Sequence, residues 1–416
     1  MTGRIAPRWL FPAATAVLAA LYLLQTVTPL RLDTDSLNYL IMGTAIADGR
    51  PVPPIGLPTG YSEIIALLDR AGIASSFHFV LANCVFLGVG LFAVWTLLGS
   101  ENERARQAVV ILTLFSFTIV RSIAMPMPEP AFFCVSLVAI ALLCRSQGVG
   151  LPARMVMIAA AIGLTILAVS LRIIGLALVP AILWASFSGV YRQLVASRSR
   201  LQVRGWVAGT VAVVAAVAIV IIGVDTLVYY AGQARLMYPQ GITAGRVYKH
   251  LSNHFVTIGE LVVNLPYAKF RQFKYGFMIV GLAAVVALLK SVRVRGPFTP
   301  LHVYAVIFVG VLIAWPHHAA RLWMPVIPVI IALIAMAELT FRPGPRSLRV
   351  MRAWLAWFAV TGMAALAYTT RISLAGDNFA STYGIAGGMS TKAADGGPKN
   401  EKYDREAREL MRRYGR

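Results

Sequence analysis

Two acidic residues, Asp33 and Asp35, follow directly after the first long apolar stretch of the chain. Acidic residues are scarce, since Asp and Glu together make up only 17 of the 416 residues. A carboxylate at a membrane–water boundary can act as a general base or bind a donor substrate, and two carboxylates can ligate a divalent cation. A structural role is the alternative for Asp35, which could cap a helix predicted over residues 36–48. The rest of the chain favours the functional interpretation.

Two further charged residues lie in apolar surroundings. Glu129 stands in a proline-broken connection between two predicted spans, where it either caps the following helix or acts as a functional group at membrane depth. Arg172 lies between two apolar runs that leave no room for a real loop. An arginine in so apolar a setting usually has an anionic partner, so Arg172 is a candidate for binding an anion.

Basic residues gather at two other places. His317, His318 and Arg321 lie among prolines that break the backbone, and such irregular segments can line a cavity. This group could hold a phosphate, whereas a metal site is disfavoured because no cluster of acidic ligands is nearby. Lys269 and Arg271 belong to the basic, aromatic segment 231–276, which could bind lipid phosphate or could simply lie over anionic headgroups.

Membrane-spanning helices must position these residues. Hydrophobic residues make up 58% of the chain and its mean hydropathy is +0.72, well above the range of soluble proteins. We therefore predict an all-α polytopic membrane protein with about eleven spans. The first apolar run is too long for a signal-peptide core, so we expect an uncleaved span. The predicted spans cover residues 9–30, 76–98, 107–120, 130–144, 155–171, 173–187, 206–230, 277–289, 301–315, 322–340 and 353–369.

The segments outside these spans define the expected organisation. Residues 1–370 are predicted to form a transmembrane catalytic domain, followed by a polar tail over 371–416. Its first external loop, 31–75, contains two stretches with helical spacing of apolar residues, 36–48 and 62–71. We expect them to lie in the membrane interface. The second external loop is 231–276.

Charge distribution predicts the orientation. The connections assigned to the cytoplasm carry 17 Lys and Arg residues, against 12 in the longer connections on the opposite side. This places the N-terminus in the cytoplasm and the two long loops on the outer side of the inner (plasma) membrane. Because eleven spans is an odd number, the tail is expected on the outer side as well. The net charge of +21 does not indicate nucleic-acid binding, because the basic residues are spread between helices. The three cysteines (Cys84, Cys134 and Cys144) all lie in apolar runs and are expected to be core residues.

Taken in order, these motifs resemble the GT-C superfamily of integral membrane glycosyltransferases, in particular the bacterial branch related to protein O-mannosyltransferases and aminoarabinose transferases. Asp33-Thr34-Asp35 stands where that family has its DxD-like motif, and Pro58-Thr59-Gly60-Tyr61 resembles a later Pro-x-x-Tyr turn. The stretches around Glu129, Arg172 and Arg321 are similar to three more family segments. The resemblance covers residues 1–340 and depends on the order of the motifs, because each alone is unspecific.

The resemblance implies an inverting transfer of a sugar from a polyprenyl-phosphate-linked donor to a lipid, glycan or protein acceptor on the external face. Asp35 or Asp33 would be the base, and Glu129 would orient a substrate. No cofactor is required, although a divalent metal could bind at Asp33 and Asp35. The candidates for the donor phosphate are Arg172, Arg321, His317, His318, Lys269 and Arg271, and those for lining the substrate are Tyr39 and Tyr61.

Two other classes of function fit part of the pattern. An envelope polysaccharide polymerase or ligase would use His317, His318 and Arg321 but would leave Asp33 and Asp35 unexplained. A lipid or solute transporter often has two halves with matching broken helices, and the two long external segments here are unlike each other. No nucleotide-binding loop is present, so an activated substrate has to come from the membrane.

Overall fold

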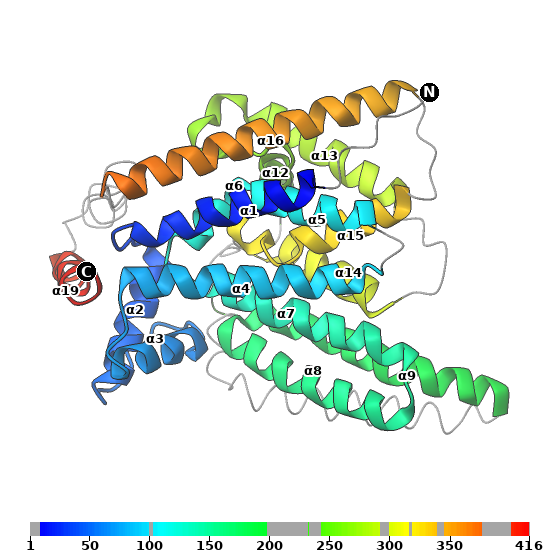
Figure 1. Ribbon diagram of the computed structural model, residues 1–416, viewed down its shortest axis with the longest axis horizontal. Helices are drawn as coiled ribbons and strands as arrows, with labels where there is room; N and C mark the ends of the chain where they lie inside the picture. The colour runs from blue at the N-terminus through cyan, green and yellow to red at the C-terminus, as the bar shows by residue number, and fades with distance from the viewer. Residues whose placement is uncertain are drawn as a thin grey trace.

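The computed structural model describes residues 9–99, 103–197, 232, 243–291, 299–315, 318–338, 345–376 and 401–415. All elements in these ranges are helices, as predicted (Figure 1). The first half contains α1 (Leu10–Leu23), η1 (Leu24–Val27), α2 (Thr34–Ala47), α3 (Gly60–Arg70), α4 (Ser76–Leu97), α5 (Glu103–Phe115), α6 (Phe117–Ile123), α7 (Pro128–Arg145), η3 (Ser146–Gly148), α8 (Leu151–Leu171), η4 (Ile173–Ala177) and α9 (Leu178–Ser197). The second contains α12 (Ala244–Val263), η5 (Tyr267–Lys269), η6 (Arg271–Phe273), α13 (Lys274–Ser291), α14 (Pro300–Ala314), η7 (Ala320–Trp323), α15 (Ile327–Glu338), α16 (Pro345–Leu374) and α19 (Glu401–Tyr414).

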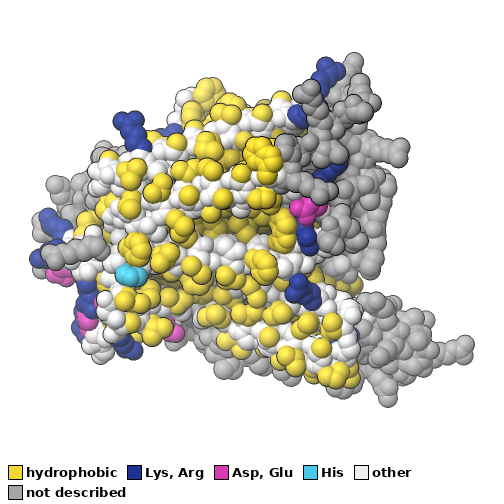
Figure 2. All heavy atoms as spheres, in the orientation of Figure 1, with side chains coloured by type: hydrophobic (Ala, Val, Ile, Leu, Met, Phe, Trp, Pro, Cys, Tyr) yellow, Lys and Arg dark blue, Asp and Glu magenta, His cyan; other side chains and the backbone are white. Residues whose placement is uncertain are grey.

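Several of these helices are long and apolar enough to cross a membrane, which makes this a multi-pass membrane protein. Within the described residues five helices qualify, namely α1 with η1, α4, α7, α8 and α16, and the bent pair α5–α6 would make six. Figure 2 shows a face covered mainly by hydrophobic side chains, with charged side chains toward the two ends of the helices. The predicted span 206–230 lies outside the described residues, and the total of about eleven stays a prediction.

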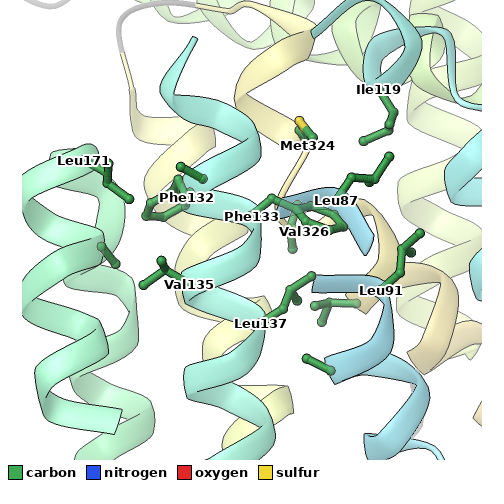
Figure 3. Close-up of a cluster of buried hydrophobic side chains, with 14 of the residues drawn as sticks. Leu87, Leu91, Ile119, Phe132, Phe133, Val135, Leu137, Leu171, Met324 and Val326 are labelled. Atoms are coloured by element: carbon green, nitrogen blue, oxygen red, sulfur yellow. The ribbon is translucent and has the colours of Figure 1, made fainter. Parts of the chain in front are cut away.

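Helix α7 forms the centre of the bundle. Phe132, Phe133 and Leu137 on this helix are at most 1% exposed. They pack between Leu87 and Leu91 of α4 on one side and Leu171 of α8 on the other (Figure 3). Within a membrane bundle, close van der Waals packing stabilises such a core, because lipid tails are as apolar as these side chains. It holds the first turn of α7, which carries Glu129, in a fixed place.

The predicted span 107–120 is broken. Helices α5 and α6 meet at Ser116 with a bend of 61°. Buried Asn264 satisfies the backbone groups freed by this break, because its side chain accepts a hydrogen bond from the Phe117 N–H at 2.8 Å and donates one to the Phe115 carbonyl at 2.9 Å. Broken helices at membrane depth need such polar partners. The break directs α6, with Arg121 in its last turn, toward the end of the bundle.

The first predicted external loop contains two packed helices, α2 and α3, as its apolar spacing indicated. A Cβ atom at Gly43 of α2 would lie 2.6 Å from the Ile65 side chain of α3. One at Gly60 of α3 would lie 2.7 Å from the Ser170 carbonyl of α8. Glycine is therefore required for both close approaches, and the α2–α3 pair rests against the end of α8. Its position in the membrane interface stays a prediction.

Two sequence-based boundaries shift in the structure. The second predicted loop, 231–276, contains the 20-residue helix α12, which packs against α13. The predicted tail, 371–416, begins within α16, which ends at Leu374, and contains the helix α19. Helix α19 packs against α2, so this part of the tail lies on the same face of the bundle as the first loop (Figure 1). The division into domains at residue 370 stays a prediction.

Candidate active site

A cluster of charged side chains forms where the first loop meets the ends of the bundle helices. Asp33 precedes α2 and Asp35 lies in its first turn, while Glu129 lies in the first turn of α7. Arg172 connects α8 to η4, and Arg321 lies in η7. Asp33 and Arg321 are 288 residues apart in the chain. The structure therefore brings together five of the residues predicted from the sequence.

Arg321 is the centre of this cluster. Its Nη1 donates to Asp33 Oδ2 at 2.9 Å, and its Nη2 donates to Asp35 Oδ2 at 2.5 Å. Its Nε lies 3.5 Å from Glu129 Oε1. One guanidinium thus holds the carboxylates of two different segments, and this explains why three acids can lie so close together.

Arg172 is the second cation of the cluster. Its Nη2 hydrogen-bonds Glu129 Oε1 and lies 3.9 Å from Asp35 Oδ2. The Glu129 side chain is only 3% exposed, and its Oε2 has no hydrogen-bond partner among the residues that the structure describes. The guanidinium of Arg172 also lies over the ring of Tyr39 at 6.0 Å, and Tyr39 packs edge-on against Tyr61 at 5.6 Å. The anionic partner expected for Arg172 is therefore Glu129, with the two tyrosines packed beside it.

A capping role was the structural alternative for Asp35 and Glu129, and neither residue is the N-cap of its helix. The N-cap of α2 is Asp33, whose N–H donates to the Ser36 hydroxyl at 2.5 Å, so the alternative role of Asp35 as the cap does not hold. The N-cap of α7 is Met127, so the capping role considered for Glu129 is wrong as well. Both acids instead occupy first turns, where the helix dipole stabilises negative charge.

A cavity of about 340 Å³ opens beside the cluster. Asp33, Arg321 and His318 line it, and so do two charged residues that the sequence analysis did not select, Arg121 and Glu260. Arg121 Nη2 lies 3.8 Å from Asp33 Oδ2 and brings a third cation to the site. Its position in the same proline-broken connection as Glu129 was the signal that could have identified it.

Glu260 lines this cavity from the last turns of α12, a helix outside the candidate spans, and is the second acid of its lining after Asp33. Burial raises the pKa of its carboxyl to about 7, although the backbone N–H of Tyr267 and the charge of Arg121 act against this. That N–H donates to Glu260 Oε1 at 3.1 Å. Glu260 escaped prediction because its segment was expected to be a basic loop.

The remaining candidates are placed less centrally. Lys269 and Arg271 are exposed and do not line the cavity, although Lys269 directly follows the lining residues Tyr267 and Ala268. His317 lies outside the described residues. Among the residues that the structure describes, no group of three or more His, Cys, Asp or Glu side chains is arranged to hold a metal ion.

Comparison with known proteins identifies the fold. No model of a known family matches the sequence, and no curated protein does. The structure is similar to ArnT from Cupriavidus metallidurans bound to undecaprenyl phosphate, with a TM-score of 0.50, 14% identity, and coverage of 93% of this chain and 81% of ArnT. Apo ArnT gives a TM-score of 0.50 and 15% identity over 92% of this chain and 80% of ArnT.

A further similar structure is arabinosyltransferase EmbB from Mycobacterium smegmatis, with a TM-score of 0.49, 14% identity, and coverage of 92% of this chain and 42% of EmbB. The ArnT structures align over most of both chains, and ArnT is a GT-C glycosyltransferase. The chain therefore has the fold of ArnT, which is the fold that its sequence motifs led us to expect.

Proposed function

We propose that this protein transfers a sugar from a polyprenyl-phosphate-linked donor to an acceptor on the external face of the plasma membrane. The observation that carries the proposal is the convergence of Asp33, Asp35 and Glu129 with Arg172 and Arg321 at one end of a GT-C-fold bundle. ArnT binds undecaprenyl phosphate in one of the similar structures, which supports a lipid of this chemical class as a partner.

The phosphate of the donor is assigned to Arg321 and Arg172. Guanidinium groups bind phosphate oxygens in the same paired geometry that they use for carboxylates. Arg321 now donates to Asp33 and Asp35, so an arriving phosphate would replace at least one of these carboxylates. The displaced carboxylate would then be free to accept the proton of the acceptor hydroxyl. Donor binding would thereby prepare the base.

In the proposed reaction the acceptor hydroxyl attacks the anomeric carbon as the bond from that carbon to the phosphate oxygen breaks. The hydroxyl proton passes to an Asp carboxylate, and the lipid phosphate leaves with its charge stabilised by the arginines. This single displacement inverts the anomeric centre. Asp33 is our first candidate for the base because it lines the cavity, which is not so for Asp35. Asp35 and Glu129 then hold Arg321 and Arg172 in place.

Several features stay proposals beside this mechanism. His318 lines the cavity next to Arg321 and could bind the phosphate or the acceptor. Lys269 and Arg271 could bind donor phosphate or lipid headgroups near the cavity. A divalent ion at Asp33 and Asp35 is the alternative to direct phosphate binding by arginine. It would have to displace Arg321 from both carboxylates.

The test uses membranes that contain wild-type protein, Asp33→Asn or the control Arg145→Ala. Arg145 is exposed at the end of α7 opposite to Glu129, so its loss leaves the cluster intact. We expect mass spectrometry of the lipid extract to show polyprenyl-phosphate-linked sugar consumed with wild type and control but accumulated with Asp33→Asn. Equal levels in all three membranes would refute the transferase proposal. Chelation of divalent ions would abolish consumption only if a metal takes part.

A further inference from the structure

Helix α19 packs against α2, and Figure 1 shows it end-on beside this helix of the first loop. Its inward side chains include Ala407, Leu410 and Tyr414, which are at most 5% exposed. The Tyr414 ring packs edge-on against Phe79 of α4 at 5.7 Å. Helix α19 is thus packed against the first loop and the bundle through an apolar side.

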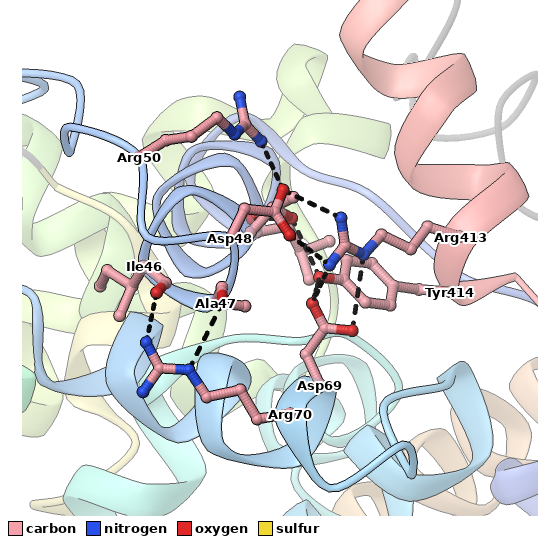
Figure 4. A network of polar contacts seen from close by, with 10 residues as sticks. Ile46, Ala47, Asp48, Arg50, Asp69, Arg70, Arg413 and Tyr414 are labelled. Atoms are coloured by element: carbon pink, nitrogen blue, oxygen red, sulfur yellow. Dashed lines mark hydrogen bonds and ion pairs between the residues drawn. The ribbon is translucent and has the colours of Figure 1, made fainter.

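Arg413 connects α19 to both helices of the first loop. Its guanidinium lies 2.9 Å from Asp48 Oδ1 and 2.5 Å from Asp69 Oδ2 (Figure 4). Asp48 ends α2 and Asp69 lies in the last turn of α3. Without a cation between them, these two carboxylates would repel each other, so Arg413 holds the two helix ends together.

Tyr414 adds a second connection at the same place. Its hydroxyl donates to Asp69 Oδ2 at 2.9 Å and forms a hydrogen bond with the Thr44 hydroxyl of α2 at 2.9 Å. On the other side of α2, Arg70 Nη2 donates to the Ile46 carbonyl at 2.5 Å (Figure 4). The C-terminal end of α2 is therefore held by side chains from both α3 and α19.

We propose that Arg413 and Tyr414 are positioning residues, which fix the C-terminal end of α2 and thereby direct its first turn, with Asp33 and Asp35, toward Arg321. Helix α2 is short and continuous, and its two ends are about 20 Å apart. A small tilt at one end therefore moves the carboxylates at the other end. The catalytic part of this inference rests on the proposed function, whereas the mechanical part does not.

A single exposed ion pair would hold α2 only weakly. Here one guanidinium bridges two carboxylates from two helices, the Asp69 side chain is only 14% exposed, and a buried tyrosine shares that carboxylate. Such paired, charge-assisted contacts are stronger and more directional than an isolated pair. A conservative Arg413→Lys change should therefore keep the charge but lose the simultaneous contact with both acids.

The test compares Arg413→Ala and Tyr414→Phe with the control Arg412→Ala. Arg412 is exposed on the same helix, so its removal changes the charge equally. Hydrogen exchange is measured on the full-length protein in nanodiscs. We expect Arg413→Ala to accelerate exchange about five- to thirtyfold at residues 34–38 as well as at 44–48, as the loss of one or two such contacts allows. Exchange that changes only at 44–48 and 67–70 would overturn the positioning role.

Binding of undecaprenyl phosphate to the same samples distinguishes the positioning role of Arg413 and Tyr414 from the proposed transferase function. We expect Arg413→Ala to weaken binding about tenfold, with Arg413→Lys intermediate and Arg412→Ala unchanged. Faster exchange at residues 34–38 with unaltered lipid binding would overturn the link from α19 to the site. If wild-type protein failed to bind the lipid, the proposed function would fail, while the exchange data would still decide the mechanical part.

Discussion

Replacement of Arg321 by alanine is the most informative single change. The substitution removes two hydrogen bonds, to Asp33 and Asp35, and the ion pair with Glu129 Oε1. If this guanidinium also binds the donor phosphate, its loss removes a charge-assisted contact worth about 1.5–3 kcal/mol. That energy corresponds to a decrease in affinity of roughly 10- to 150-fold.

The assay compares two lipids that differ only in the phosphate. Undecaprenyl phosphate and undecaprenol are titrated into wild-type protein and Arg321→Ala in nanodiscs. The apolar tail contributes equally to both, so the ratio of the two dissociation constants reports the phosphate contact alone. We expect this ratio to be large for wild type and to fall by roughly 10- to 150-fold in the variant, with Arg145→Ala unchanged.

The same substitution also disturbs the fold, so a second variant is needed. Arg321→Ala leaves three acids with one cation fewer, and Glu129 is almost fully buried. Breaking such a pair costs about 3–5 kcal/mol. Adding Asp33→Asn to Arg321→Ala removes one of the unpaired charges and should recover part of that stability without recovering phosphate binding. A variant that is stably folded and keeps the wild-type ratio of affinities would refute the phosphate role of Arg321.

Three further predictions test the site and its orientation. Asp33→Asn should abolish sugar transfer, while Asp35→Asn should lower it by loosening Arg321; near-wild-type transfer by both, at equal expression, would contradict the catalytic assignment. In the folded protein the pKa of Glu260 is raised from 4.5 to about 7, so between these pH values the folded state binds a proton that the unfolded state has lost. The free energy of unfolding should therefore decrease by up to about 3 kcal/mol as the pH rises from 4.5 to 7. Thermal unfolding in micelles should show that Glu260→Gln lacks this loss, and parallel pH profiles would show the assignment to be wrong. In a background without the three native cysteines, an impermeant thiol reagent should label Thr59→Cys but not Ser197→Cys in intact cells; labelling of both would mean that the span count and the shared external site are incorrect.

Chain composition and local patterning were enough for the helical architecture and for most of the charged residues of the site. The length of the apolar runs alone predicts membrane helices, because backbone N–H and C=O groups in lipid must form their hydrogen bonds within a helix. Charges in apolar surroundings also stand out, since each needs a partner. This is why Glu129, Arg172 and Arg321 could be selected as single residues.

Only the tertiary structure decided which of these residues meet. Arg321 contacts Asp33 across 288 positions of the chain, and no local pattern carries that pairing. Asn264, at the end of the distant helix α12, accepts a hydrogen bond from a backbone N–H at the break beside Ser116. This break places Arg121 in the lining of the cavity. The contact of Arg413 with α2 likewise spans 365 positions. Side-chain pairs so far apart depend on how the helices pack, whereas helix length and polarity are properties of each segment alone.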